Sequence, residues 1–290
     1  MKLNQRKIEG FTGFLILRIA TLLVIFVLFF ILYDIFSKGS GAVTWEFLTH
    51  KPRKGMTEGG IWPAIVGTFW VSLVTLIFSV PIGMFAAIYL NEYAKQGHLV
   101  RLIRLAIRNL SGVPSIVYGL FGFSLFVLML NLGLSVLSSG LTLGLLTLPW
   151  TITASEEALK TVPRSYREGA LALGATKWQT IRTNVLPYAV PGMLTGTILG
   201  LARAAGETAP ILFTGAAFFW PVLPKFPKVL FQQFMALPYH LFIMSTQHHE
   251  ILKVRPLAYG TALVLIVLIL LMNTVAIGVR YRFRKKYKRS

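Results

Sequence analysis

Arg203 and Glu207 are the residues whose types and spacing point most directly to chemistry. They lie four positions apart within a long apolar stretch, and residues at i and i+4 share one face of a helix. An ionised side chain at membrane depth is costly, and it usually faces a cavity, a partner or a substrate path. We therefore take this pair as the candidate functional centre of the chain.

The composition indicates which class of protein surrounds this pair. Of the 290 residues, 55% are hydrophobic and only 13% are charged, whereas soluble domains carry about 25% charged residues. A soluble protein with an apolar core does not account for several separate apolar stretches of about 20 residues. The absence of cysteine excludes a disulfide framework and thiolate chemistry. The sequence therefore predicts a multi-span membrane protein.

Six transmembrane helices are predicted from length and hydropathy, at residues 14–36, 66–90, 110–132, 134–152, 187–213 and 257–279. The first is too long for a signal peptide and lacks a clear cleavage site, so we interpret it as a retained helix. The third and fourth are nearly contiguous, which predicts a hairpin turning at 131–133. The expected organisation is an N-terminal tail, first helix and outer loop in 1–60, a transmembrane domain in 61–280 and a basic tail in 281–290.

The distribution of Lys and Arg predicts the orientation of the chain. Of 29 such residues, 20 lie in the segments 1–18, 91–109, 153–185 and 280–290, and 8 lie in 37–60 and 217–255. Basic residues accumulate on the cytoplasmic side of a membrane, so both termini are expected there. The net charge of +19 then reflects topology and contact with anionic lipid, and nucleic-acid binding is not needed to explain it.

Ser111 and Ser115 flank Pro114 at the start of the predicted third span. A proline inside a membrane helix frees a backbone carbonyl, which must be bonded elsewhere or line a cavity. The two serines would then offer a polar face to a substrate path. A simple packing kink, with each serine bonded back to its own helix, explains the pattern equally well at this point.

The loop 153–187 is predicted to form short helices separated by turns. Thr153 and Ser155 precede the acids Glu156 and Glu157, which predicts a helix start because acids favour the positive end of the helix dipole. Two capping-box patterns then predict two further helices, at Ser165 with Glu168 and at Thr176 with Gln179.

Gly174 is expected to end the first of these two helices in a left-handed conformation, and Pro187 is expected to stop the second. Tyr166 and Trp178 lie on this otherwise charged loop and favour a docking surface for a protein partner. The alternative is an amphipathic helix at the membrane interface.

The fifth predicted span is rich in small residues and helix breakers. Gly192, Gly196 and Gly200 form a face that allows close helix contact, and the section 206–210 is expected to unwind locally. The outer segment 217–255 is expected to form a short amphipathic helix. Four of its side chains resemble metal ligands only weakly, so we predict no metal site: His240, His248, His249 and Glu250.

No nucleotide-binding P-loop, nucleophile elbow or H-E-x-x-H motif occurs in the chain. The sequence therefore predicts no catalytic residues, no cofactor bound by this chain and no enzymatic activity of its own.

The cytoplasmic loop resembles the EAA motif of ABC importer permeases, which is E-A-A, three residues, G, nine residues and I-x-L-P. Here the motif stands as Glu168-Gly169-Ala170, Gly174 and Asn184-Val185-Leu186-Pro187, with its spacing intact. Gly169 and Asn184 depart from the usual residues. Three further stretches, 111–122, 201–215 and 235–240, resemble phosphate-importer permeases of the PstA type.

This resemblance implies the type I ABC importer permease fold and ATP-driven import of inorganic phosphate across a bacterial inner membrane. The implied complex contains a second, PstC-like permease, two PstB-like ATPase subunits that bind ATP and Mg, and a PstS-like periplasmic phosphate-binding protein. The residues expected to couple to the ATPase are Glu156, Glu157, Arg167, Glu168, Ala170, Gly174, Leu186 and Pro187. Those expected along the substrate path are Arg203, Glu207, Thr208, Ser111 and Ser115.

Arg203 is the residue expected to bind the anion, because a guanidinium fork matches the oxygens of phosphate. Glu207 would balance it when the path is empty, since conduction needs sites that the ion can leave. A structural ion pair that locks the helix is the alternative role. Two rival functions remain: a permease for another oxyanion, and a secondary transporter or channel that works without ATP.

Overall fold

The computed structural model describes the backbone of residues 2–287 and the side chains of residues 13–285. Within this part, five helices are long and apolar enough to cross a membrane, and one bent pair of helices adds a sixth candidate span. This confirms the predicted all-α membrane protein with about six transmembrane helices. Residues 288–290 of the predicted basic tail lie outside the described part.

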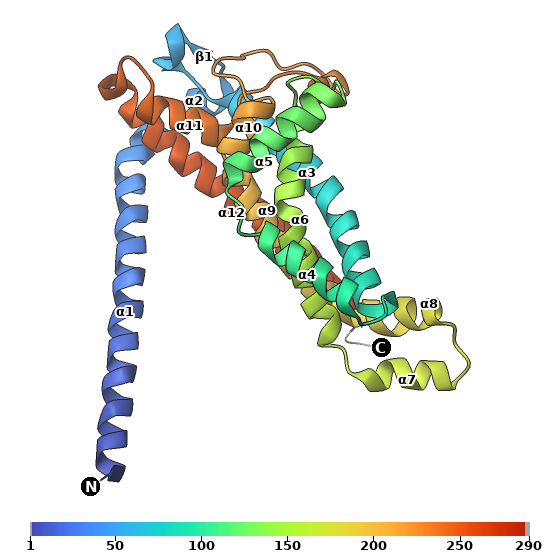
Figure 1. Cartoon of the computed structure of the whole chain (residues 1–290). Helices are drawn as coiled ribbons and strands as arrows, with labels where there is room; N and C mark the ends of the chain where they lie inside the picture. The colour runs from blue at the N-terminus through green and yellow to red at the C-terminus, as the bar shows by residue number, and fades with distance from the viewer. Residues whose placement is uncertain (1, 288–290) are drawn as a thin grey trace.

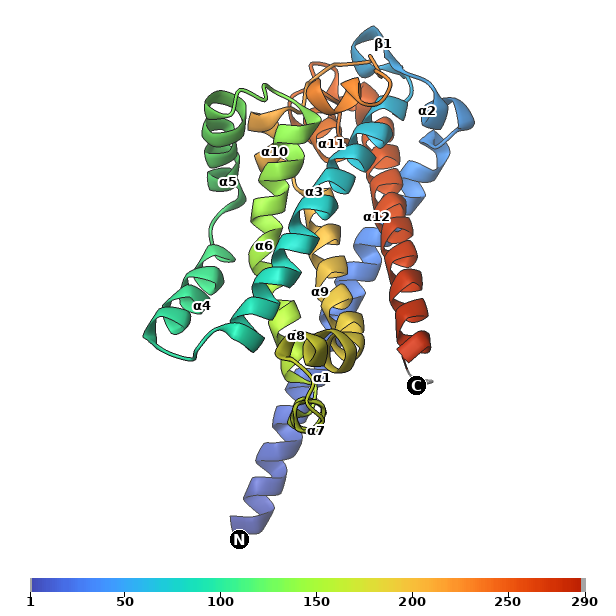
Figure 2. The same cartoon turned by 90° about the vertical axis from the view of Figure 1, so that its right-hand side faces the viewer.

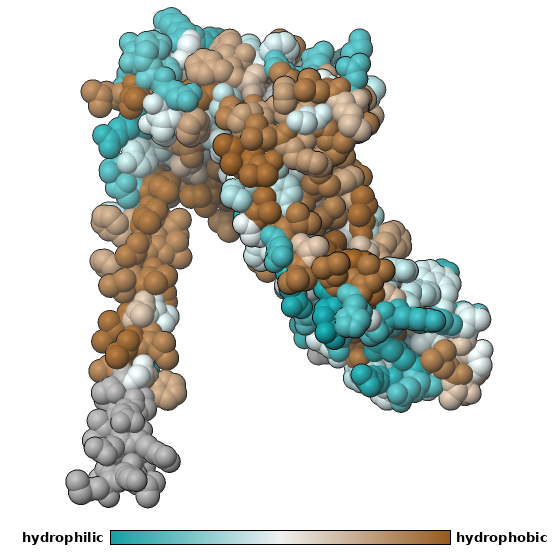
Figure 3. Space-filling view, viewed as in Figure 1, coloured by the Kyte–Doolittle hydropathy of each residue, from teal (hydrophilic) through white to brown (hydrophobic). Residues whose placement is uncertain are grey.

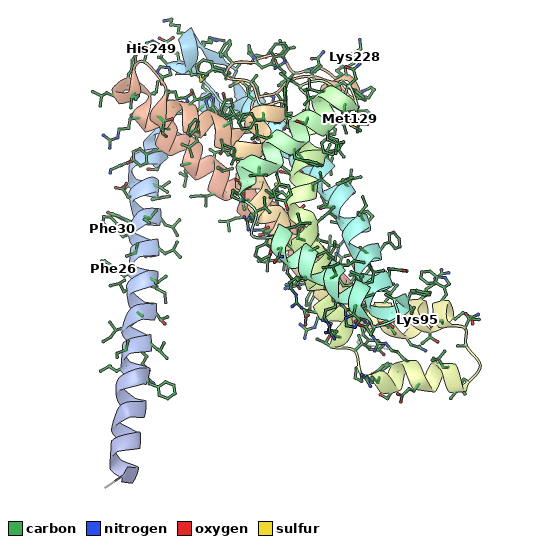
Figure 4. The ribbon with its side chains drawn as sticks, in the orientation of Figure 1. Phe26, Phe30, Lys95, Met129, Lys228 and His249 are labelled. Carbon is green, nitrogen blue, oxygen red and sulfur yellow. The ribbon has the colours of Figure 1, made fainter. Side chains whose placement is uncertain are left out.

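Helix α1 (Lys2–Gly39) stands apart from the other membrane helices (Figure 1). Phe26 and Phe30 extend from it without meeting another helix (Figure 4). Only its end approaches α12 (Ile251–Tyr287), where the Lys38 ammonium lies 5.2 Å from the centre of the Tyr259 ring. Most of the first span therefore presents an apolar surface to its surroundings.

The body of the protein is formed by α3 (Trp62–Ile88), α6 (Val136–Lys160) and α9 (Leu186–Gly206), which pack together with α12 (Figure 2). The first residues of α1 and the last of α12 lie at the same end of this body as the loop 153–187 (Figure 2). An even number of membrane crossings places both ends of a chain on the same side of the membrane.

Small residues allow the helices of the body to approach closely. A Cβ added at Gly144 of α6 would lie 2.4 Å from a ring carbon of Phe78 on α3. One added at Gly196 of α9 would lie 2.0 Å from the Cβ of Ala154 on α6. Gly196 is the middle residue of the predicted glycine face 192–200, so the expected close helix contact there is confirmed.

The prediction of one continuous third helix over 110–132 is wrong. Helix α4 (His98–Leu110) ends where that helix was expected to begin, and α5 (Ser115–Gly122) starts after a bend of 103°. A π-helical segment, η4 (Phe123–Met129), extends α5. Pro114 is the physical reason, because a proline disfavours helical conformation in the residue before it.

The hairpin predicted at 131–133 is confirmed. Asn131 and Gly133 both adopt left-handed conformations, with φ of 52° and 67°. Ser135 then caps α6 by accepting a hydrogen bond of 3.1 Å from the backbone N–H of Ser138. A capping side chain satisfies one of the free N–H groups at a helix start.

The helix start predicted at Glu156 and Glu157 is wrong, because α6 continues through both residues to Lys160. Tertiary contacts extend the helix beyond the apolar stretch. The Glu156 carboxylate is buried and accepts a hydrogen bond of 2.7 Å from Arg104 Nε, and Leu159 is fully buried. The loop therefore begins after Lys160, later than expected.

Helix α7 (Arg164–Ala172) follows this turn. Its N-cap residue is Pro163, and no capping-box hydrogen bond joins Ser165 and Glu168, so that prediction is wrong. Ser165 lies inside the first turn of the helix because the helix begins one residue before it. Gly174 has a φ of 84°, which confirms the left-handed turn predicted at this position.

Helix α8 (Lys177–Thr180) begins with the predicted capping box. Gln179 N–H donates to Thr176 Oγ1 at 3.3 Å, and Thr176 N–H donates to the Gln179 side chain at 2.8 Å. The predicted stop at Pro187 is wrong, because the π-helical segment η5 (Ile181–Val185) joins α8 to α9. Pro187 occupies the first turn of α9, where a missing N–H is tolerated.

The opposite end of the molecule is built from short elements: η1 (Ser40–Ala42), α2 (Trp45–Thr49), β1 (Pro52–Arg53), η2 (Lys54–Met56), β2 (Glu58–Gly59), η6 (Lys228–Phe231) and α11 (Leu237–Thr246). The two strands pair antiparallel, with Pro52 opposite Gly59. The amphipathic surface helix expected in 217–255 is wrong: α11 is largely buried because it packs against α12.

His240 is a buried titratable group of α11, which is not one of the span-length helices. Its Nδ1 has no hydrogen-bond partner among the described residues. Burial, together with the nearby His248, lowers the pKa of His240 from 6.5 to about 4. The folded protein therefore holds this imidazole neutral at pH values where the unfolded chain would protonate it.

We predict that the protein loses stability as the pH falls from about 6.5 to about 4, because the unfolded state then binds a proton that folded His240 does not. The free energy of unfolding should fall by at most about 1.4 kcal/mol per pH unit from this group. Thermal unfolding in detergent across this range measures the effect. His240→Gln should show a shallower slope, and an identical slope would contradict the assignment.

Candidate functional site

The helix that carries the predicted charged pair is broken at the pair itself. Helix α9 ends at Gly206, Glu207 is extended with φ −74° and ψ 133°, and α10 (Ala209–Thr214) begins after Thr208. This confirms the unwinding expected at 206–210. The i and i+4 spacing predicts that Glu207 shares a helix face with Arg203. That prediction is wrong, because Glu207 lies beyond the end of the helix.

The pair forms nonetheless. Arg203 Nε donates to Glu207 Oε1 at 3.3 Å, and the guanidinium carbon lies 5.3 Å from the centre of the Trp150 ring on α6. The Arg203 side chain is 43% exposed and that of Glu207 is 18% exposed. A stack on an aromatic face and one long hydrogen bond therefore hold the guanidinium in place.

Arg203 differs from Arg104 and Arg167, which also form ion pairs. The Arg167 guanidinium donates to a buried carboxylate and to backbone carbonyls. That of Arg104 donates to a buried carboxylate, to the Gln96 side chain and to the Leu90 carbonyl. Arg203 uses only Nε, and its two terminal nitrogens have no hydrogen-bond partner among the described residues. These donors are available to an oxyanion, which binds a guanidinium through two parallel N–H groups.

The other residues predicted along the path are only partly brought together. Thr208 adjoins Glu207 in the break, and α5, which begins at Ser115, packs against α10. Ser111 caps the end of α4 instead and donates to the Arg108 carbonyl at 2.6 Å. The predicted shared helix face of Ser111 and Ser115 is wrong, because the break at Pro114 separates them.

A second candidate site is the outer surface of α7, α8 and their connecting turn. Leu173 is 91% exposed there, and Leu171, Tyr166 and Trp178 are also exposed. Figure 3 shows hydrophobic patches within the hydrophilic surface of this end. The Glu168 carboxylate is exposed and has no ion-pair partner in the part of the chain that the structure describes. An exposed apolar patch rimmed by polar residues is typical of a protein-binding surface.

Other residues of the predicted coupling set do not lie on this surface. Ala170 is buried, and Leu186 and Pro187 are half-buried in the first turn of α9. The Glu156 carboxylate pairs internally with Arg104, whereas Glu157 is exposed and pairs with Lys160 at 2.8 Å. These contacts indicate which of the set can face a partner and which hold the loop in place.

Arg167 belongs to the internal group. Its Nη2 donates to Glu92 Oε1 at 2.7 Å and its Nε donates to Glu92 Oε2 at 3.1 Å. Sequence reasoning missed Glu92, Arg104 and Trp150. The available signal was that Glu92 is a lone acid at the end of an apolar span, a position that calls for a partner.

Histidines near the opposite end do not gather as a metal site. His248 Nε2 lies 2.7 Å from the Gly55 carbonyl oxygen, and its Nδ1 accepts from the Glu250 N–H at 3.0 Å. Among the described residues, no three His, Asp or Glu side chains are placed to hold a metal ion.

Comparison with known proteins identifies the family to which the chain is similar. The family described as "Binding-protein-dependent transport system inner membrane component" matches residues 79–289. The chain is 34% identical over 265 residues to the "Phosphate transport system permease protein PstA 1" of Mycobacterium tuberculosis (strain CDC 1551 / Oshkosh), covering 88% of this chain and 83% of the relative. It is 34% identical over 280 residues to the "Phosphate transport system permease protein PstA" of Yersinia pestis, covering 94% and 89%.

Solved structures share the arrangement of the helices. The chain matches a subunit of the inward-facing MetNI methionine ABC transporter with a TM-score of 0.57 at 16% identity, covering 77% of this chain and 94% of that one. It matches a bacterial ABC transporter that imports the polysaccharide alginate with a TM-score of 0.55 at 13% identity, covering 79% and 80%. At these identities the likeness shows the fold alone.

Proposed function

Because the chain belongs to the family of inner-membrane components of binding-protein-dependent transport systems, we propose that it is the permease subunit of an ATP-driven importer of inorganic phosphate. Its fold is the expected type I ABC importer permease fold. Relatives named as phosphate permeases support the substrate. The observation that carries the proposal is the exposed Arg203 guanidinium, whose terminal nitrogens are available at a helix break.

The proposed complex pairs this chain with a second, PstC-like permease, two PstB-like ATPase subunits and a PstS-like binding protein. ATP and Mg would bind in the ATPase, since this chain carries no P-loop. The exposed surface of α7 and α8 is the proposed ATPase contact. That end of the molecule, with both termini, is then cytoplasmic in the bacterial inner membrane, as the distribution of basic residues supports.

The proposed path uses the weakness of the Arg203–Glu207 pair. This partly exposed pair has one long hydrogen bond, whereas the Arg167–Glu92 pair has two shorter ones. Phosphate offers two oxygens to the guanidinium and therefore displaces Glu207 at a small cost. Because Glu207 competes with the anion for Arg203, the site does not bind phosphate too tightly for it to leave. When the anion leaves, Glu207 pairs with Arg203 again.

The test is uptake of radioactive phosphate into proteoliposomes. These contain this chain together with the second permease, the ATPase and the binding protein that are encoded by neighbouring genes. We expect phosphate uptake to require ATP on the side of the membrane where the ATPase lies. Excess sulfate or molybdate should not reduce the rate of phosphate uptake. Competition by either oxyanion would support the rival permease. Uptake driven by an ion gradient without ATP would support a secondary transporter and overturn the proposal.

A further inference from the structure

Glu92 is a buried acid at the end of α3 that the path and the docking surface leave unexplained. It lies in the π-helical segment η3 (Tyr89–Tyr93), which extends α3 at the end that carries α7 and α8. Its side chain is only 7% exposed. Asn91 Nδ2 donates to Glu92 Oε1 at 2.8 Å, which helps to orient the carboxylate.

Arg167 of α7 donates two hydrogen bonds to this carboxylate, at 2.7 Å and 3.1 Å. The same guanidinium donates to the Val162 carbonyl at 2.8 Å and to the Leu159 carbonyl at 3.0 Å. Leu159 belongs to the last turn of α6, and Val162 lies in the turn that follows it. Arg167 therefore fastens α7 to the ends of two membrane helices at once.

Few other contacts join α7 to the membrane helices. Its packing partners are α8 and η5, and its Tyr166 ring meets Tyr188 edge to face with ring centres 4.8 Å apart. A second contact to the end of α3 comes from α8, whose Lys177 ammonium lies 5.0 Å from the centre of the Tyr93 ring. A displacement of α7 would thus reach α3 through the Arg167–Glu92 pair.

A buried, bidentate ion pair transmits such a displacement because breaking it leaves a charge without a partner at low exposure, which is costly. An exposed pair would simply separate and exchange its contacts for water. The pair joins positions 75 residues apart, so it is a connection of the tertiary structure and independent of the continuous path from α8 through η5 to α9.

We propose that Glu92 is a positioning residue for transport: through Arg167 it couples movement of the docking helix α7 to α3, as a second route beside α9. The inference rests on the proposed function, since it assigns the ATPase as the source of the movement. α3 packs along α6, and α6 carries Trp150, which stacks on Arg203. The second route therefore leads from the docking surface to the helix that holds the candidate anion site.

The test compares the wild-type complex with Glu92→Gln in proteoliposomes that contain both permeases, the ATPase and the binding protein. Phosphate uptake and ATP hydrolysis are measured on the same sample, per mole of complex. We expect Glu92→Gln to keep the ATPase bound and hydrolysing ATP, while phosphate imported per ATP falls at least about 10-fold. The charge exchange Glu92→Arg with Arg167→Glu should recover part of that ratio.

Asp34→Asn is the matched control, since it removes the acid of the Asp34–Lys38 pair on α1, away from the docking loop. It should leave the ratio unchanged, and an equal fall there would overturn the proposal. So would a wild-type ratio in Glu92→Gln. If Glu92→Gln does not accumulate, Glu92→Asp replaces it: the shorter acid should lower the ratio about 3-fold at normal abundance, and an unchanged ratio overturns the proposal.

These outcomes separate the inference from the proposed function. Wild-type complex without ATP-dependent phosphate uptake refutes the function, and the inference falls with it. Wild-type uptake with a normal ratio in the Glu92 variants refutes the inference alone.

Discussion

Arg203→Gln is expected to reduce ATP-driven phosphate uptake about 100-fold while leaving the amount of protein in the membrane unchanged. Glutamine is shorter and keeps some hydrogen bonding, but it removes the charge and the fork whose terminal nitrogens have no partner among the described residues. Loss of a charge-assisted, bidentate interaction costs about 3 kcal/mol, which corresponds to roughly 100-fold. The measurement is phosphate uptake in proteoliposomes, normalised to the permease content by immunoblot.

Two variants sharpen this prediction. Arg203→Lys keeps the charge without the fork, so its uptake should lie between those of the wild type and Arg203→Gln. Arg18→Gln is the matched control, because it makes the same change at an exposed arginine of α1, and its uptake should equal that of the wild type. Normal uptake by Arg203→Gln at normal abundance would show that the Arg203–Glu207 pair is structural.

Glu168→Lys combined with Gly174→Asp is expected to abolish copurification of the ATPase with the permease. The first change reverses an exposed charge on α7 that has no ion-pair partner among the described residues. The second places a side chain where the backbone has a φ of 84°, which strains the turn by about 1–2 kcal/mol. Together they alter both the charge and the shape of the surface that carries the exposed Leu173. We expect at least about 10-fold less ATPase in an affinity purification of the permease.

The control for this pair is Glu58→Lys with Gly55→Asp in the hairpin at the opposite end. Gly55 also has a positive φ, of 63°, and Glu58 is also an exposed acid, so the substitutions match in type, although Glu58 pairs with Lys54 at 2.8 Å. This variant should retain the ATPase. Retention of the ATPase by the Glu168 and Gly174 variant, with ATP-dependent uptake intact, would refute docking at α7 and α8.

Local patterns in the sequence predicted those parts of the fold that depend on neighbouring residues. The turn at Asn131 and Gly133, the left-handed Gly174 and the capping box of Thr176 with Gln179 all formed as expected. Each uses backbone preferences or a hydrogen bond spanning three residues, and such features form wherever the chain is free to adopt them. Length and hydropathy similarly predicted the number of spans, because a membrane core of about 30 Å requires about 20 apolar residues.

The local predictions that were wrong were overruled by packing or by hydrogen-bond register. Glu156 does not start a helix, because its pairing with Arg104 and the burial of Leu159 extend α6 past the apolar stretch. Pro187 does not stop a helix, because the π-helical segment η5 precedes it and Pro187 lies in the first turn of α9. A propensity of a few tenths of a kcal/mol yields to contacts of this size.

The sequence by itself therefore determined the membrane class, the number of spans and the identity of Arg203 and Glu207 as an expensive charged pair. Only the tertiary structure decided how these charges are used. It joined Arg167 to Glu92 across 75 positions and Arg104 to Glu156 across 52, and it stacked Arg203 on Trp150 of another helix. Such partners are set by which helices pack together, and the spacing of residues along one chain carries no record of that.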